Sequence, residues 1–244
     1  MKASKLHSAW IIIASLSYTA TTCVLAIYKK LTRQMNRDWV NQRLKHWTKQ
    51  VLGILGVTCT VVNRHNTKPQ PGQATIIICN HSSLYDIPLT YYAFPDMSLR
   101  MLAKKELARI PLMGSAMKSA EIPTINRQNR EQAIKDLEAV KKLMESGIIM
   151  WIAAEGTRSH DGKLGTFKQG PFITAIQTNA TIIPIGIRGA YDILPARTHQ
   201  FTLNQHAEVH IGEAIDTSQY TLENKALLIE KAHAAMKALV GETT

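Results

Sequence analysis

The chain has 244 residues, of which 45% are hydrophobic, and it carries a formal net charge of +11. This length and apolar content suffice for one substantial core, and no Pro-, Gly- or Ser-rich linker divides the chain, so a string of separate domains is excluded. Its three cysteines, Cys23, Cys59 and Cys79, lack CxxC spacing, which argues against both a disulfide framework and a zinc site.

The positive charge is concentrated near the N-terminus. Residues 1–70 have a net charge of +10, whereas the remaining residues have a net charge of only +1. A basic segment beside a nearly neutral body indicates an anionic partner that binds at one end, either nucleic acid or an anionic membrane.

An uncharged stretch decides between these two partners. Residues 6–28 contain no Lys, Arg, Asp or Glu, and about 20 residues are enough to cross the core of a bilayer. We therefore expect membrane association and no nucleic-acid partner. Ser and Thr side chains make the stretch less apolar than a typical span, so a tilted, partly embedded helix is the alternative to a complete crossing. A cleaved signal peptide is disfavoured because the apolar run has no Ala-x-Ala site.

Residues 31–54 have the spacing of an amphipathic helix. The apolar positions that share one face are Trp39, Val40, Leu44, Trp47, Val51 and Leu52, and the flanking basic residues are Arg37, Arg43, Lys45 and Lys49. We expect an interfacial helix on an anionic leaflet with its indoles at headgroup depth, the alternative being an ordinary helix packed on the core. The basic residues beside the apolar stretch predict that the body of the protein faces the cytoplasm from the inner (cytoplasmic) membrane.

From residue 55 to residue 244 the pattern alternates between strand and helix. Strands are predicted at 57–63, 74–79, 98–103, 121–125, 148–153, 181–187 and 208–211, and helices at 111–119, 128–145, 167–178 and 222–240. This alternation predicts an α/β domain over residues 55–244, with a largely parallel central sheet flanked by helices. Residues 1–54 would form a membrane-associated helical pair that precedes it.

A His and an Asp follow the apolar strand predicted at 74–79. His81 and Asp86 are five positions apart, an offset that would turn them about 140° from each other on one helix. They can meet only if His81 lies in the turn at the carboxyl end of the strand, with Asp86 folded back beneath it. Ser82 or Ser83 could cap the helix that carries Asp86 in its first turn. A neutral imidazole there could accept a proton, with the carboxylate holding its other nitrogen. The alternative is that the two side chains merely brace the turn.

His81 and Asp86 would be the base half of a catalytic triad, but the sequence shows no obvious nucleophile to complete it. A substrate hydroxyl could therefore be the nucleophile and attack an acyl carbon with no acyl-enzyme intermediate. A serine hydrolase that uses Ser82 or Ser83 is a rival interpretation, although the chain has no Gly-x-Ser-x-Gly motif. A second rival is a non-catalytic adaptor that binds anionic lipid through residues 1–70.

A second polar cluster follows the strand predicted at 148–153. Gly156 permits a close backbone approach, Thr157 offers a hydroxyl, and Arg158 presents a planar fork that suits phosphate oxygens. Arg127 and Lys105 also follow predicted strands and would add positive charge at the same edge of the sheet. The alternative is that each of these basic residues merely contacts solvent, as a single basic residue at a strand end usually does.

Four blocks of the sequence resemble the glycerolipid acyltransferase family, and most closely its 1-acyl-sn-glycerol-3-phosphate (lysophosphatidic acid) acyltransferases. The blocks are Asn80-His81-x4-Asp86, Ile122-x-x-Ile125-Asn126-Arg127, Glu155-Gly156-Thr157-Arg158-Ser159 and Ile183-Pro184-Ile185. The segment Lys104-Lys105-Glu106-Leu107 is also similar to that family. The first and third blocks together are specific, and the resemblance covers residues 75–190.

The resemblance implies that a fatty acyl group passes from acyl-CoA or an acyl-carrier protein to the free hydroxyl of a lysophospholipid, giving phosphatidic acid for phospholipid biosynthesis. His81 would be the general base and Asp86 its orienting partner. The acceptor's phosphate would be bound by Lys105, Arg127, Glu155, Gly156, Thr157 and Arg158. No cofactor or metal is implied, and the expected partners are the lysophospholipid, the acyl thioester, anionic membrane lipid and, for one choice of donor, acyl-carrier protein.

One block departs from the family's pattern. Many members have Gly-x-x-Phe-Ile-Asp-Arg, whereas this chain has Ala120-Glu121-Ile122-Pro123-Thr124-Ile125-Asn126-Arg127. This departure leaves the acceptor open between lysophosphatidic acid, another lysolipid and glycerol 3-phosphate.

Overall fold

The structure is a computed structural model that describes residues 1–126 and 128–242. Its helices are α1 (Lys5–Leu31), α2 (Arg37–Ile54), α3 (Asp86–Ala93), α4 (Met113–Ser119), α5 (Arg130–Glu145), α6 (Gly170–Gln177), α7 (Ala190–Ile193) and α8 (Lys225–Val240), with a 3-10 helix η1 (Lys105–Arg109). Its strands are β1 (Thr58–Val62), β2 (Thr75–Cys79), β3 (Leu99–Met101), β4 (Ala103–Lys104), β5 (Thr124–Ile125), β6 (Ile149–Ala153), β7 (Thr181–Arg188) and β8 (His206–Ile211).

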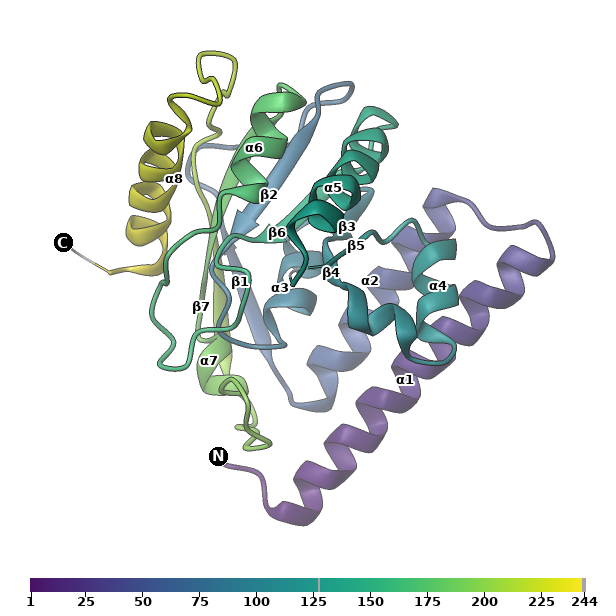
Figure 1. The fold of residues 1–244 in the computed structure, drawn as a ribbon. Helices are drawn as coiled ribbons and strands as arrows, with labels where there is room; N and C mark the ends of the chain where they lie inside the picture. The colour runs from purple at the N-terminus through teal and green to yellow at the C-terminus, as the bar shows by residue number, and fades with distance from the viewer. Residues whose placement is uncertain (127, 243–244) are drawn as a thin grey trace.

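The described strands form a largely parallel central sheet, as the alternating pattern predicted (Figure 1). Its order is β1-β8-β7-β2-β6-β3, and β7, β2, β6 and β3 all run in the same direction. The strand β8 pairs antiparallel with β7, and β1 pairs parallel with β8, so these two strands at one end of the sheet run the opposite way. The carboxyl ends of β2, β6 and β7 therefore meet at one edge of the sheet.

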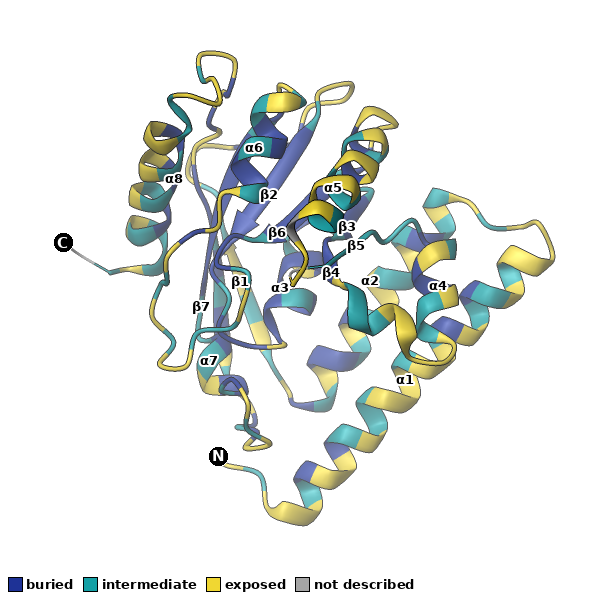
Figure 2. Ribbon diagram, in the orientation of Figure 1, coloured by how far each residue is buried: buried dark blue, intermediate teal, exposed yellow. Residues whose placement is uncertain are grey.

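Each face of the sheet is covered by helices. Along β2 the side chains alternate, so that Ile76 and Ile78 pack against α5, α6 and α8 while Ile77 and Cys79 face the side of α2, α3 and α7. All five residues of β2 are buried (Figure 2). A strand buried on both faces is typical of a parallel sheet, and it explains the unbroken apolar run in the sequence.

The two N-terminal helices belong to the same core as the sheet. Ile11 of α1 and Val51 and Leu52 of α2 are buried in the apolar cluster that also contains Ile77. The opposite side of α1 is exposed along its length (Figure 2). The Trp47 indole joins α2 to α1, because its Nε1 donates a hydrogen bond to Thr19 Oγ1 at 3.0 Å.

Several element bounds differ from the prediction for local reasons. The second helix begins at Arg37 because the Asn36 side chain caps it and accepts a hydrogen bond from the Trp39 N–H at 2.8 Å. The strand predicted at 98–103 divides into β3, which joins the main sheet, and β4, which pairs with β5 in a separate two-stranded sheet. The short helices η1 and α7 were not predicted.

Candidate active site

The turn after β2 is fastened to the neighbouring strand β7. The Asn80 side chain donates to the Ile187 carbonyl at 2.9 Å and accepts from the Ile187 N–H at 2.7 Å. This amide replaces the next rung of the β2–β7 ladder, so the chain can leave the sheet at residue 80 without leaving those buried backbone groups unpaired. The backbone of His81 is therefore held at the carboxyl end of β2.

His81 and Asp86 meet as their spacing predicted. His81 Nδ1 lies 2.7 Å from Asp86 Oδ2, with His81 in the turn and Asp86 at the first position of α3. The same Oδ2 accepts the backbone N–H groups of Ser82 and Ser83, each at 2.8 Å. The predicted capping of this helix by Ser82 or Ser83 is wrong, because Tyr85 precedes the helix and no side chain caps it.

The carboxylate leaves one imidazole nitrogen available. The Asp86 side chain is fully buried, whereas the His81 side chain is 16% exposed. Because Nδ1 is bonded to a carboxylate, it carries the proton of the neutral ring, and Nε2 has the free lone pair of a base. The indole of Trp151 packs edge-on against the imidazole, at 6.3 Å between ring centroids and 89° between planes, and restricts its rotation.

Neither serine of the turn is placed as a nucleophile. Ser82 and Ser83 are both buried, and Ser83 Oγ donates to the Leu194 carbonyl at 2.8 Å, away from the imidazole. Within the described residues, neither hydroxyl hydrogen-bonds to His81. The geometry therefore leaves the role of nucleophile to a substrate group rather than to the protein.

Glu155 connects the turn to the loop after β6. One carboxylate oxygen accepts the His81 N–H at 2.6 Å and the other accepts the Gly165 N–H at 2.8 Å. Burial raises the pKa of Glu155 to about 7, although the two N–H groups act in the opposite direction. Glu155, predicted at the phosphate site, thus has both carboxylate oxygens on backbone donors of the turn and the loop.

Arg158 lies on the same loop, next to a residue that contacts His81. The Ser159 N–H donates to the His81 carbonyl at 2.7 Å, which places Arg158 and His81 at the same edge of the sheet. Arg158 is half-buried and Thr157 is exposed. Gly156 has a φ of +73°, and a Cβ there would lie 3.2 Å from Lys168 Cγ, so this position favours glycine. The described contacts of Arg158 include no carboxylate, so its guanidinium is available to an anion.

Lys105, another predicted site residue, lies next to the β4–β5 sheet. Lys105 is half-buried and begins η1, directly after β4. Lys104 of β4 is paired in register with Ile125 of β5, so Lys105 and Asn126 follow neighbouring strand ends. The prediction for Arg127 lies outside the described residues.

The unusual Glu121 has a defined partner on α2. Arg37 and Glu121 form a two-pronged salt bridge, with Nε–Oε2 and Nη2–Oε1 both at 2.8 Å, and this bridge lowers the pKa of Glu121. Arg37 Nη2 also donates to Ser146 Oγ at 2.7 Å. This departure from the family's pattern therefore joins the segment before β5 to α2 and to the end of α5.

An apolar cavity of about 270 Å³ lies beside the turn. Its walls come from α1, α2, α3, η1 and α4, and they include Ala26, Trp39, Met113 and Ala116. Leu84 and Ile87, on either side of Asp86 in the chain, also line it. Residues 81–87 thus contain both the imidazole and part of the wall of the apolar cavity. Among the described residues, no three His, Cys, Asp or Glu side chains gather as a metal site requires.

Comparisons with known proteins agree with this arrangement. The model of the family described as Acyltransferase matches residues 59–188. The 1-acyl-sn-glycerol-3-phosphate acyltransferase alpha of Mus musculus is 27% identical over 190 residues, which cover 78% of this chain and 66% of that protein. The 1-acyl-sn-glycerol-3-phosphate acyltransferase of Cocos nucifera is 36% identical over 144 residues, which cover 59% of this chain and 45% of that protein. The chain thus spans less than two thirds of the length of both relatives.

A solved structure has the same fold over nearly the whole chain. The crystal structure of the 1-acyl-sn-glycerophosphate (LPA) acyltransferase PlsC from Thermotoga maritima gives a TM-score of 0.80 at 23% sequence identity. The match covers 97% of this chain and 94% of that one. The architecture, including the N-terminal helices, is therefore that of a known fold.

Proposed function

The chain belongs to the acyltransferase family, and on this premise we propose that it moves a fatty acyl group from an acyl thioester to the free hydroxyl of 1-acylglycerol 3-phosphate, giving phosphatidic acid. The observation that carries the proposal is the 2.7 Å bond between His81 Nδ1 and Asp86 Oδ2 beside the loop of Arg158. The activities for which the mouse and coconut relatives are named support this acceptor. Another lysolipid or glycerol 3-phosphate is the alternative.

The proposed reaction needs one base and no acyl-enzyme. His81 Nε2 removes the proton of the acceptor hydroxyl while the hydroxyl oxygen bonds to the thioester carbonyl carbon. The tetrahedral intermediate then loses the thiolate as the C–S bond breaks, and the thiolate takes the proton back from Nε2. The products are an ester and a free thiol. A placed base typically accelerates such a step ~10²–10⁴-fold, and Asp86 supports it by stabilising the imidazolium.

We assign the acceptor's phosphate to the loop of Arg158. The guanidinium and the Thr157 hydroxyl supply donors, and Lys105 and Arg127 add charge from the segments that follow β4 and β5. Glu155 would contribute indirectly, by holding the loop against the backbone of His81. Binding the phosphate fixes the hydroxyl near the base, which lowers the entropy cost of the transfer.

The apolar cavity is suited to an acyl chain. It lies between the N-terminal helices and the turn of His81, and it is lined mostly by apolar side chains. We propose acyl-CoA or acyl-carrier protein as the donor, because both carry the acyl group as a thioester. The reaction requires no cofactor, because the thioester itself is the activated species.

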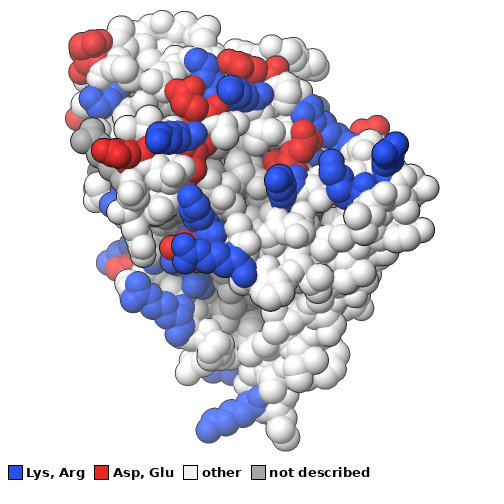
Figure 3. Space-filling view, turned by 45° about the vertical axis from the view of Figure 1, so that its right-hand side comes forward, with Lys and Arg blue, Asp and Glu red and all other residues white. Residues whose placement is uncertain are grey.

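We propose that α1 anchors the protein to the cytoplasmic side of the inner membrane. By length and composition it is the one helix among the described residues that could cross a bilayer. Its inner face packs on α2 and α4, whereas Leu6, Trp10 and Ile13 are exposed on its outer face. Figure 3 shows a broad uncharged surface at the lower right of the molecule, with Lys and Arg side chains around its margins. A helix packed along one face in this way favours embedding in one leaflet over crossing.

The test is a thiol-release assay with the purified full-length chain in detergent. The transferase predicts thiol release from an acyl thioester that depends on lysophosphatidic acid, with phosphatidic acid as the product. His81→Ala should abolish it, whereas the control His65→Ala, at an exposed position, should not. Parallel reactions use both thioester carriers and three acceptors: lysophosphatidic acid, a second lysolipid and glycerol 3-phosphate.

The other outcomes contradict the proposal in different ways. Thiol release without any acceptor would indicate a hydrolase. No release with any donor and acceptor would indicate a lipid-binding adaptor. Release that depends on a different acceptor would keep the reaction class and correct the substrate.

A further inference from the structure

The loop between β6 and α6 is held at its far end by two carboxylates. The backbone N–H groups of Leu164 and Gly165 are adjacent in the chain, and each donates to a different glutamate at 2.8 Å. Gly165 is held by Glu155, which belongs to the candidate site. Leu164 is held by Glu242, which follows α8 and lies 78 residues further along the chain. Glu242 has no role in the reaction derived above.

The backbone of Glu242 is itself fixed at the end of α8. Gly241 has a φ of +82°, its N–H donates to the Ala238 carbonyl, and the Glu242 N–H donates to the Lys237 carbonyl at 3.1 Å. These two bonds form a Schellman motif, which ends a helix in a defined geometry. Arg188 of β7 also donates to the Leu239 carbonyl at 2.7 Å, so the end of α8 is tied to the central sheet.

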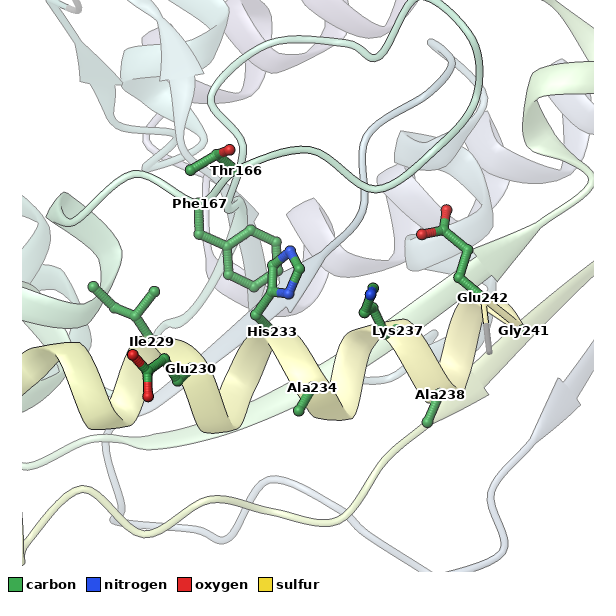
Figure 4. Close-up of a pocket in the computed structure, with 10 residues that line it drawn as sticks. All are labelled: Thr166, Phe167, Ile229, Glu230, His233, Ala234, Lys237, Ala238, Gly241 and Glu242. Atoms are coloured by element: carbon green, nitrogen blue, oxygen red, sulfur yellow. The ribbon is translucent and has the colours of Figure 1, made fainter. Parts of the chain in front are cut away.

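The Glu242 side chain faces the loop rather than solvent alone. Figure 4 shows its carboxylate on the same side of α8 as His233 and Lys237, the side on which Thr166 and Phe167 lie. Phe167 packs against His233 at 4.8 Å between ring centroids, which fixes the segment just after Gly165. The end of the loop is thus attached to α8 by one polar and one aromatic contact.

The start of the loop is attached to the catalytic turn. The Ser159 N–H donates to the His81 carbonyl at 2.7 Å, and the Tyr191 hydroxyl donates to the His160 carbonyl at 2.9 Å. Arg158 comes directly before Ser159, at the start of a loop that is held there by the His81 carbonyl and at its far end by Glu155 and Glu242. The far attachments therefore act on Arg158 through the 159–165 segment.

We propose that Glu242 is a positioning residue for acceptor binding, which holds the 158–165 loop so that Arg158 is presented to the acceptor's phosphate. This inference rests on the proposed function, because it assigns a second, remote determinant to the same phosphate site. The acceptor reaches a loop that is already ordered, so binding does not have to supply the free energy of ordering it. The thioester is bound elsewhere and should be less affected.

The experiment compares Glu242→Ala, Glu242→Gln and the control Glu230→Ala. Glu230 also lies on α8, but it is exposed and its carboxylate forms no salt bridge among the described residues. Hydrogen–deuterium exchange of the peptide containing residues 159–166 is measured on the full-length chain in detergent. Steady-state kinetics with lysophosphatidic acid and an acyl thioester give separate KM values for acceptor and donor.

Glu242→Ala should speed exchange in the 159–166 peptide and raise the acceptor KM about 3- to 10-fold, the range expected for one partly exposed hydrogen bond. The donor KM and kcat should change less than about twofold. Glu242→Gln keeps an acceptor oxygen and should restore most of both properties, and Glu230→Ala should resemble the wild type.

Three results would overturn the proposal: unchanged exchange in Glu242→Ala, faster exchange with an unchanged acceptor KM, or the same effects in Glu230→Ala. The exchange measurement does not require activity. A wild type with no transferase activity would therefore refute the proposed function, and the loop attachment would still be decided by exchange.

Discussion

Replacing Asp86 by Asn separates the charge of this side chain from its role as a hydrogen-bond acceptor. Oδ2 accepts from His81 Nδ1 at 2.7 Å and from the N–H groups of Ser82 and Ser83 at 2.8 Å each. Oδ1 has no hydrogen-bond partner in the part of the chain that the structure describes. An Asn can therefore place its amide nitrogen at the Oδ1 position and keep the three bonds with its oxygen.

The two changes at this position should have different costs. Asp86→Asn should cost about 1–3 kcal/mol of unfolding free energy, because the three existing donors keep their acceptor and only the new amide N–H groups lack one. Asp86→Ala leaves two buried backbone N–H groups unpaired and should cost about 2–6 kcal/mol. Catalysis should fall ~10²–10⁴-fold even in Asp86→Asn, since the neutral amide no longer stabilises the imidazolium.

Urea unfolding followed by circular dichroism gives the stability of both variants, and thiol release with lysophosphatidic acid gives the rate. If Asp86→Asn retained activity within threefold of the wild type, the charge of Asp86 would be irrelevant and the assignment of His81 as a base would lose its support. If Asp86→Ala were as stable as Asp86→Asn, the two N–H groups would have acceptors other than this carboxylate.

Three further outcomes are expected. The folded protein keeps the Glu155 proton up to a pKa of about 7, above the ordinary 4.5. The unfolding free energy should therefore fall by about 3 kcal/mol as the pH rises from 4.5 through about 7. In Glu155→Gln, urea unfolding at the same pH values should show no such decrease. Arg158→Ala should lower kcat/KM for lysophosphatidic acid about 10- to 100-fold without changing Tm, and an equal loss in the exposed Arg64→Ala would exclude a specific contact. Trp10→Asp should reduce sedimentation with anionic vesicles more than Leu227→Asp, an equally exposed apolar site on α8, and equal effects would contradict anchoring through α1.

The contact between His81 and Asp86 could be predicted because its geometry is local. A buried strand, a five-residue offset and a following helix leave one arrangement in which His81 and Asp86 can meet, and the structure has that arrangement. The parallel sheet was likewise predictable, since β2 and β7 are nearly continuous apolar runs and helical periodicity separates them. Both inferences use only interactions between residues that are near in sequence.

The roles of the two glutamates could not be predicted in the same way. Glu155 accepts the N–H of His81, 74 residues away, and Glu242 accepts the N–H of Leu164. Every residue except proline has a backbone N–H, so the identities and spacing of the side chains do not show which N–H group a glutamate will bind. The one available signal was that Glu155 directly follows a buried strand, which marked it as a site residue but not as a ligand of the backbone. The antiparallel pairing of β8 was hidden for a related reason, because strand direction depends on the path of the 189–205 connection.

The N-terminal helices contribute to the interior of the protein as well as to its outer surface. Ile11, Val51, Leu52 and Leu55 fill the same cluster as Ile77, and burying each such side chain stabilises a fold by about 1.5–3 kcal/mol. A truncated version made for solubility would therefore uncover the sheet and one wall of the cavity beside the base. The helix that we propose to lie on the lipid surface thus also completes the interior through its opposite side, so its removal would disturb the core as well as the outer surface.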